Sequence, residues 1–211
     1  MENGSNPLDP SSLPKPKLPE LIHRWAFDES GGDGTVLVDS IGGANGSIED
    51  GGPNDGSVED GRVTLPGGGR ASTDYVRLPS NLLSSLKSAT IETWTTQYSS
   101  QNWSRVFSAG SATNNVMHMA FSRGTNINQN EFRWNAQANI TLQDFGGAPT
   151  NPFDEQVHWV VTLDNENGAA DQTQIIIYKN GEPVKSGSTT HPLSGLNDTD
   201  FFLGRSQWND A

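Results

Sequence analysis

The chain has 211 residues, a length that fits one globular domain of ordinary size. Only 32% of the residues are hydrophobic, 23 are glycine and none is cysteine, so the fold must be held by packing without disulfide bonds. The formal net charge of −12 argues against nucleic acid as a partner, because that surface needs clustered Lys and Arg. No apolar run approaches the roughly 20 residues of a membrane span, which argues against membrane insertion.

The N-terminal part divides into a leader and the start of a domain. Residues 1–20 are rich in proline, serine and asparagine without alternation, which is typical of a flexible linker. We therefore place the domain at residues 21–211. Its first predicted strand is 21–27, and short strands follow between acidic, glycine-rich loops. Residues 81–87 could form one helical turn.

The strongest strand predictions come after this turn. They are residues 89–98, 104–110, 116–122, 131–137, 158–164 and 173–187. The last range contains Asn180 and Gly181, which supply the positive φ that a tight hairpin demands. Short strands at close intervals without intervening helices predict an all-β, two-sheet antiparallel sandwich.

The order of segments resembles a known family. The sequence contains, in order, HRWAFDES, VDSIGGANGSI, DYVRLP, TIETWTTQ, WSRVFSAG, HWVVTLD, IIIYKNGEPVKSG and FFLGRSQ. Over about residues 21–208 this resembles the laminin-G-like jelly rolls of the concanavalin A-like lectin/glucanase superfamily. The resemblance implies a jelly-roll topology and a non-catalytic binding module of a larger exported protein, which recognises glycan or a protein partner through rim loops. Such a module is extracellular or on the cell surface, and its export signal would lie outside this sequence.

The resemblance also implies a difference at the C-terminus. In the family, the segment similar to LGRSQWNDA is followed by one more strand, which lies beside the first one. We therefore expect the sandwich to lack its final C-terminal strand, so that residues 21–27 form an unpaired edge. The missing segment, the proline-rich leader or a strand from another chain could cover this edge. Pairing with another chain would make the protein a structural or adhesive module, which is the alternative hypothesis.

A calcium site is implied by the same resemblance. The loop that runs from Asp39 to Gly46 is similar to a family loop that often contributes to calcium binding. Asp39 and Asn45 would supply oxygen ligands, and Asp28 would be a further one. The alternative is that Asp39 and Asn45 only cap turns.

A ligand platform is predicted from aromatic residues near strand ends. Sugar recognition needs flat rings for apolar sugar faces and a few fixed polar groups beside them. The candidates that combine these properties are Trp103, Arg105, Arg133, Trp134, Asn135, Gln137 and Trp208. Trp25, Trp94 and Trp159 lie in the middle of strands, at positions where the resemblance implies core or semi-core aromatics, so we expect them to serve packing.

Catalysis is disfavoured by the surroundings of Glu92. Retaining glycosidases need two carboxylates about 5 Å apart. The residues from Thr93 to Gln97 contain no second acid, so Glu92 is interpreted as a structural residue. The four histidines show no ligand spacing, and no nucleophile or phosphate-binding motif is present. A polysaccharide-degrading enzyme is therefore the hypothesis with least support.

Overall fold

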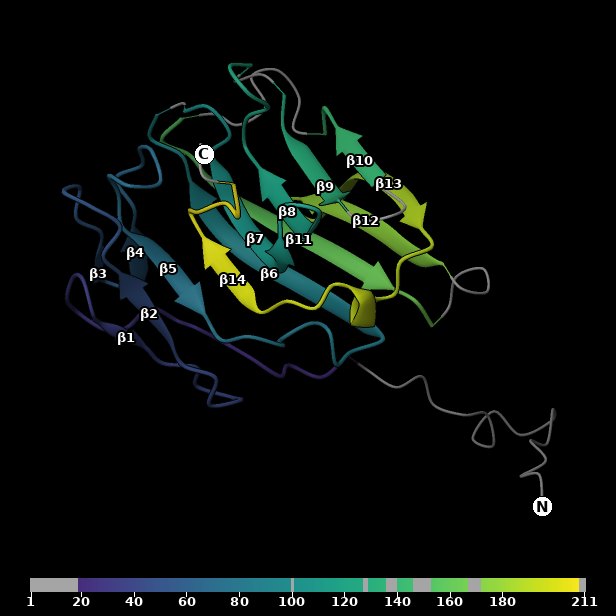
Figure 1. The fold of residues 1–211 in the computed structure, drawn as a ribbon, viewed down its shortest axis with the longest axis horizontal. Helices are drawn as coiled ribbons and strands as arrows, with labels where there is room; N and C mark the ends of the chain where they lie inside the picture. Colours follow the sequence, from purple (N-terminus) through teal and green to yellow (C-terminus); the bar gives the residue numbers. More distant parts are fainter. Residues whose placement is uncertain are drawn as a thin grey trace.

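The computed structural model describes residues 19–99, 101–126, 129–135, 140–145, 153–166 and 172–208. Two antiparallel sheets face each other in these ranges (Figure 1). The larger sheet has the order β1 (Val36–Leu37), β2 (Gly46–Glu49), β5 (Tyr75–Leu78), β14 (Asp200–Leu203), β7 (Arg105–Ala112), β8 (Asn115–Ala120), β9 (Glu131–Asn135) and β10 (Ile140–Gln143). The smaller sheet has the order β13 (Glu182–Thr189), β12 (Thr173–Lys179), β11 (Gln156–Asp164) and β6 (Ser88–Thr96).

Two smaller elements complete the part of the fold that the structure describes. Strands β3 (Ser57–Glu59) and β4 (Arg62–Thr64) form a separate hairpin. A single 3-10 turn, η2 (Leu193–Gly195), precedes β14. Within the described residues no α-helix is present, and no helix is long and apolar enough to cross a membrane. The predicted helical turn at residues 81–87 is therefore wrong; this segment contains only bends and hydrogen-bonded turns.

The core lies between the two sheets. Strand β11 alternates between buried and partly exposed residues, and its buried side chains include Trp159 and Leu163. Across the sandwich they belong to one cluster with Phe107 of β7 and Phe132 of β9. Successive residues of a strand point to opposite faces of its sheet. The strands of the larger sheet that contribute to this core therefore also carry side chains on the face that points away from the core. The predicted all-β, two-sheet antiparallel sandwich is confirmed.

Strand β14 occupies the middle of the larger sheet. Phe201 pairs with Leu78 of β5 on one side and with Ala109 of β7 on the other. The segment FFLG therefore has partners on both sides from earlier parts of the chain. A strand beyond Ala211 concerns residues outside this sequence and stays a prediction.

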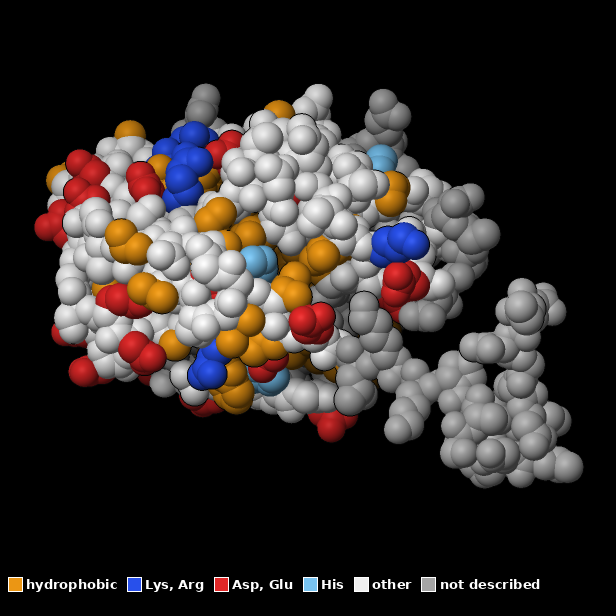
Figure 2. All heavy atoms as spheres, turned by 90° about the horizontal axis from the view of Figure 1, so that it is seen from below, with side chains coloured by type: hydrophobic (Ala, Val, Ile, Leu, Met, Phe, Trp, Pro, Cys, Tyr) orange, Lys and Arg blue, Asp and Glu red, His pale blue; other side chains and the backbone are white. Residues whose placement is uncertain are grey.

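The N-terminal segment differs from its predicted strand. Residues 21–27 form only an isolated bridge, between Trp25 and Asp39, and Phe27 adopts a positive φ of 60°, which ends extended pairing. Most of the predicted leader, residues 1–18, lies outside the described residues. The exposed large apolar side chains near this edge are Leu21, Ile22, Val36, Val38 and Ile41. Figure 2 shows apolar side chains scattered over the face seen from below, where the N-terminal segment lies in Figure 1.

Candidate functional site

A row of side chains crosses the face of the larger sheet that points away from the smaller sheet, here called the outer face. In the strand register, Arg77 pairs with Phe202, Phe202 with Ser108, Ser108 with His118, and His118 with Arg133. Their sequence neighbours face the core, so the alternation along each strand directs this row outward. Residues that are far apart in the sequence thus meet on one surface.

Three predicted ligand residues converge beside this row. A register shift in β7 between Arg105 and Phe107 pairs Arg105 with Ala120, on the same face as His118. The guanidinium carbon of Arg105 lies 5.0 Å from the ring centroid of Trp103 and 5.7 Å from that of Trp208. Both indoles are half-buried. Two aromatic rings with a cation between them therefore border the outer face.

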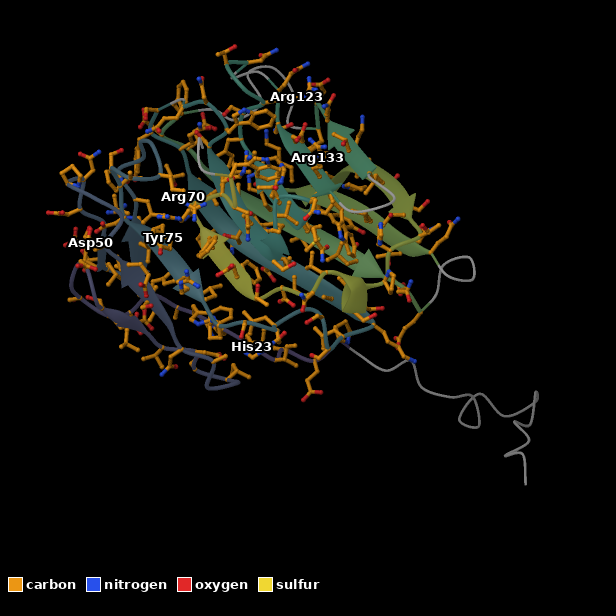
Figure 3. All side chains as sticks on the ribbon, viewed as in Figure 1. His23, Asp50, Arg70, Tyr75, Arg123 and Arg133 are labelled. Atoms are coloured by element: carbon orange, nitrogen blue, oxygen red, sulfur yellow. The ribbon has the colours of Figure 1, made fainter. Side chains whose placement is uncertain are left out.

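Trp208 belongs to the segment that follows β14, and hydrogen bonds from other parts of the chain hold this segment in place. Arg70 donates hydrogen bonds to the carbonyl oxygens of Ser206, at 3.1 Å, and Trp208, at 3.2 Å. Gln207 accepts a hydrogen bond from the Ser108 hydroxyl. The Trp208 ring then meets the ring of His118 edge-on, with the centroids 5.6 Å apart. Figure 3 shows Arg133 on the near sheet, Arg123 above it, and Arg70 in the loop that precedes β5.

A buried polar network lies beneath this surface. The Glu131 side chain is only 2% exposed, and its Oε1 lies 3.3 Å from Nε2 of His118. Its Oε2 accepts hydrogen bonds from Nε of Arg123 and Nε2 of Gln143, each at 3.1 Å. Both side-chain oxygens of Glu131 are thus hydrogen-bonded, which fixes β8, β9, β10 and the side chain of Arg123 relative to one another.

Burial and charge set the protonation of this network. Burial lowers the pKa of His118 to about 4, the Arg105 and Arg133 charges act in the same direction, and Glu131 opposes them. Burial alone would raise the pKa of Glu131, but hydrogen bonds from His118 and Gln143 hold it below its usual value. At neutral pH the pair is therefore a neutral imidazole that donates to a carboxylate.

The other predicted ligand residues lie in different environments or outside the described part of the chain. Arg133 is half-buried and belongs to the row of side chains on the outer face. Trp134 is wrong as a ligand residue: it is 0% exposed and belongs to the core, because it follows Arg133 in a strand and must face the opposite side. Asn135 ends β9, but its side chain is not among those described, and Gln137 lies outside the described residues.

Asp39 is a hydrogen-bond acceptor for its own loop. Its buried carboxylate accepts hydrogen bonds from the backbone N–H groups of Arg24, Ile41, Gly42 and Ala44. Nδ1 of His23 lies 2.7 Å from Oδ2. Burial would raise the pKa of Asp39, but these hydrogen bonds, led by that of Arg24, hold it far below its usual range.

The residues assigned to calcium by resemblance do not fit that ion. Both oxygens of Asp39 already face N–H donors, whose positive ends would repel a cation. Oδ1 of Asn45 accepts from the Asp39 backbone N–H at 3.0 Å, and Asp28 is exposed. Within the described ranges, no three His, Asp or Glu side chains are grouped so that they could hold a metal ion. The arrangement fits the alternative, in which Asp39 and Asn45 cap turns.

Glu92 lies on the smaller sheet, away from the outer face. Its Oε1 is 2.8 Å from Nε2 of His158, and His158 stacks on Trp94 with ring centroids 4.3 Å apart. Trp94 is 61% exposed, so the prediction that it packs in the core is wrong, whereas Trp159 is buried as predicted.

Several residues of the outer face were missed by sequence reasoning. They are His118, Glu131, Arg123 and Arg70. One signal was present: His118 stands between Met117 and Met119 in a strand, so two core-facing methionines imply that the histidine faces outward. Arg70, in contrast, lies in a glycine-rich loop, and only the fold brings it to Trp208.

Comparisons with known proteins agree with this architecture. Residues 68–211 match the Laminin_G_3 family, described as concanavalin A-like lectin/glucanases superfamily. The chain belongs to this family. The laminin-G-like resemblance is thereby confirmed. No curated protein matches the sequence.

Solved structures support the fold. Domain 4 of AbnA, a GH43 extracellular arabinanase from Geobacillus stearothermophilus, in complex with arabinotriose, aligns with a TM-score of 0.52 and 16% identity. The match covers 86% of this chain and 75% of that one. The alginate lyase Aly36B covers 88% of this chain and 81% of its own, with 12% identity and a TM-score of 0.38, which is too low to carry any argument. At these identities the likeness concerns the fold alone.

Proposed function

We propose that this protein is a carbohydrate-binding module whose ligand lies on the outer face of the larger sheet. The observation that carries the proposal is the convergence of Trp103, Arg105 and Trp208 beside the row that contains Arg133. Indole rings provide flat apolar surfaces for sugar C–H groups, the buried Arg105 holds the two rings in place, and the half-buried Arg133 donates hydrogen bonds to ring and hydroxyl oxygens. The domain of similar fold that was solved with arabinotriose supports a sugar as the ligand class.

A binding role without catalysis is proposed for the same surface. Glycosidic cleavage by the common mechanism uses two carboxyl groups, one of which must be free to donate a proton. Glu131 is instead buried and bonded to three partners, and Asp200 forms an ion pair with Arg77 at 2.7 Å. These contacts favour structural roles for both acids.

We also propose that the protein acts outside the cell, as part of an exported protein. The support is the domain of similar fold, which belongs to an extracellular arabinanase. The absence of cysteine is compatible with this location, because packing between the two sheets supplies the stability.

The test uses three tryptophan variants and a panel of neutral and acidic oligosaccharides. We expect Trp103→Ala and Trp208→Ala each to weaken the best sugar by about tenfold, as expected when one stacked ring is lost. Trp94→Ala is the matched control, because this exposed indole lies on the smaller sheet. Isothermal titration calorimetry measures all affinities. Equal losses in all three variants, or a loss only in Trp94→Ala, would refute the proposed surface.

A further inference from the structure

Arginines gather on the outer face of a protein that is acidic overall. The sequence has 25 Asp and Glu against 13 Lys and Arg. The arginines that lie on this face or border it are Arg70, Arg77, Arg105, Arg123, Arg133 and Arg205. These arginines concentrate positive charge on one side of a chain that is acidic overall.

One group of arginines surrounds two aromatic rings at the β5 and β14 side. The guanidinium carbon of Arg205 lies 4.0 Å from the ring centroid of Tyr75, and that of Arg77 lies 4.9 Å from the ring of Phe202. Arg205 also donates to the backbone oxygen of Arg70 at 3.3 Å. Burial lowers the pKa of Arg205, and the charges of Arg70 and Arg77 lower it further. These contacts hold Arg205 against Tyr75 and beside the backbone of Arg70.

A second group lies at the β7, β8 and β9 side. The strand register pairs Arg133 with His118 and Arg105 with Ala120, on the same face. Arg123 reaches the same network through Glu131 and keeps a side chain that is 47% exposed. Since His118 is neutral at pH 7, it adds no positive charge and demands no counterion.

Carboxylates of this face offset only part of the charge. The strand register places Glu49, Glu131 and Asp200 there. Glu49 accepts from the hydroxyl of Ser47, Glu131 is buried beside Arg123, and Asp200 pairs with Arg77. Two of the six arginines, Arg77 and Arg123, thus pair with carboxylates of this face, on a chain whose formal charge is −12.

We propose that the carbohydrate recognised here is acidic, with a carboxylate on each of several sugar units, as in an oligouronate. This inference rests on the proposed function and adds the chemical class of the ligand. Guanidinium groups bind carboxylates through paired N–H donors, which lysine cannot reproduce. The acidic remainder of the molecule repels a polyanion, so the ligand is confined to this face.

Calorimetry with matched ligands tests the inference. The probes are oligogalacturonates and oligomannuronates, each beside its carboxyl-reduced, neutral form. We expect each acidic form to bind at least about tenfold more tightly than its neutral counterpart. This preference should shrink when NaCl rises from about 0.05 M to about 0.5 M, because salt screens exposed charges.

Charge-removing variants locate the effect. Arg123→Gln and Arg133→Gln should each weaken the acidic probes by about tenfold and the neutral probes by much less. Arg24→Gln is the control, since it removes an exposed arginine beside Asp39, at the opposite edge of the sheet from β9. An equal loss in Arg24→Gln would mean that only the net charge of the protein matters and would overturn the inference.

The outcomes separate this inference from the proposed function. Equal or tighter binding of the neutral forms overturns the acidic class and leaves carbohydrate binding standing. No binding of any sugar overturns both. Binding of a single-stranded DNA oligonucleotide as tight as that of the acidic sugars would show a general polyanion surface and would also overturn the inference.

Discussion

Asp39 shows how one side chain can organise a whole loop. Its side chain is 0% exposed, and four backbone N–H groups of residues 24–44 donate to it. Removing the carboxylate would take the acceptor away from four partly buried N–H groups at once, a cost of about 3 kcal/mol. The residue that resembles a metal ligand in the sequence therefore acts through hydrogen bonds.

We predict that Asp39→Ala lowers the free energy of unfolding by about 3 kcal/mol, measured by urea denaturation. Asp33→Ala, in the exposed preceding loop, should change it by less than about 0.5 kcal/mol. Calcium should not raise the melting temperature of the unaltered protein. A calcium-dependent rise that Asp39→Ala abolishes would contradict the turn-capping role.

His118 makes stability depend on pH. Its pKa is lowered to about 4 in the folded chain, whereas the unfolded chain has an ordinary histidine of about 6.5. Between these values only the unfolded chain gains the proton, so this contribution to stability is complete above pH 6.5 and is lost as pH falls toward 4. The total effect is about 3 kcal/mol at about 1.4 kcal/mol per pKa unit.

The check is urea denaturation at several pH values from 7 to 4.5. The unaltered protein should lose stability over this range, and His118→Gln should lose clearly less. The carboxylates of Asp39 and Glu131 have lowered pKa values and respond mainly at lower pH, so they do not produce the same slope. Identical slopes in the two proteins would refute the assignment to His118.

At the scale of elements, a sequence reveals those features that depend on turn residues and on the alternation of side chains along a strand. The hairpin between β12 and β13 was predicted from Asn180 and Gly181, and both adopt positive φ, 51° and 86°. Because successive residues of a strand point to opposite faces, Arg133 and Trp134 lie on opposite sides of β9, although both were predicted to bind ligand. Strand β10, with four residues, was missed because so short a segment carries little alternation.

The close pairing of β7 with β8 at Gly110 leads to a prediction at the scale of elements. A Cβ at Gly110 would lie 2.3 Å from the backbone oxygen of Asn115 and 2.7 Å from the Cα of Val116, so the two strands would have to separate. We expect Gly110→Ala to destabilise the protein by about 2 kcal/mol. Gly195→Ala should be nearly neutral, because its nearest neighbours lie at 3.9 Å or more. Chemical denaturation of both variants measures the difference, and equal stabilities would contradict the close approach.

At the scale of the whole molecule, strand order creates the candidate site. Trp103, Arg105, Arg133 and Trp208 could be selected from the sequence because aromatic and polar residues occur together near strand ends. Their convergence could not be predicted, since it requires β14 to insert between β5 and β7 and so bring Trp208 to His118. The arginine-rich face depends on the same pairing of β14 with β5 and β7, and the net charge of the chain does not reveal it.

The most direct measurement of carbohydrate binding on the outer face is NMR of the tryptophan indole N–H groups, assigned with single-tryptophan variants, during titration with the oligosaccharide panel. The account predicts that a bound sugar shifts the signals of Trp103 and Trp208 and leaves those of Trp94 and Trp159 unchanged. Shifts confined to Trp94, or no shift with any sugar at high concentration, would contradict it.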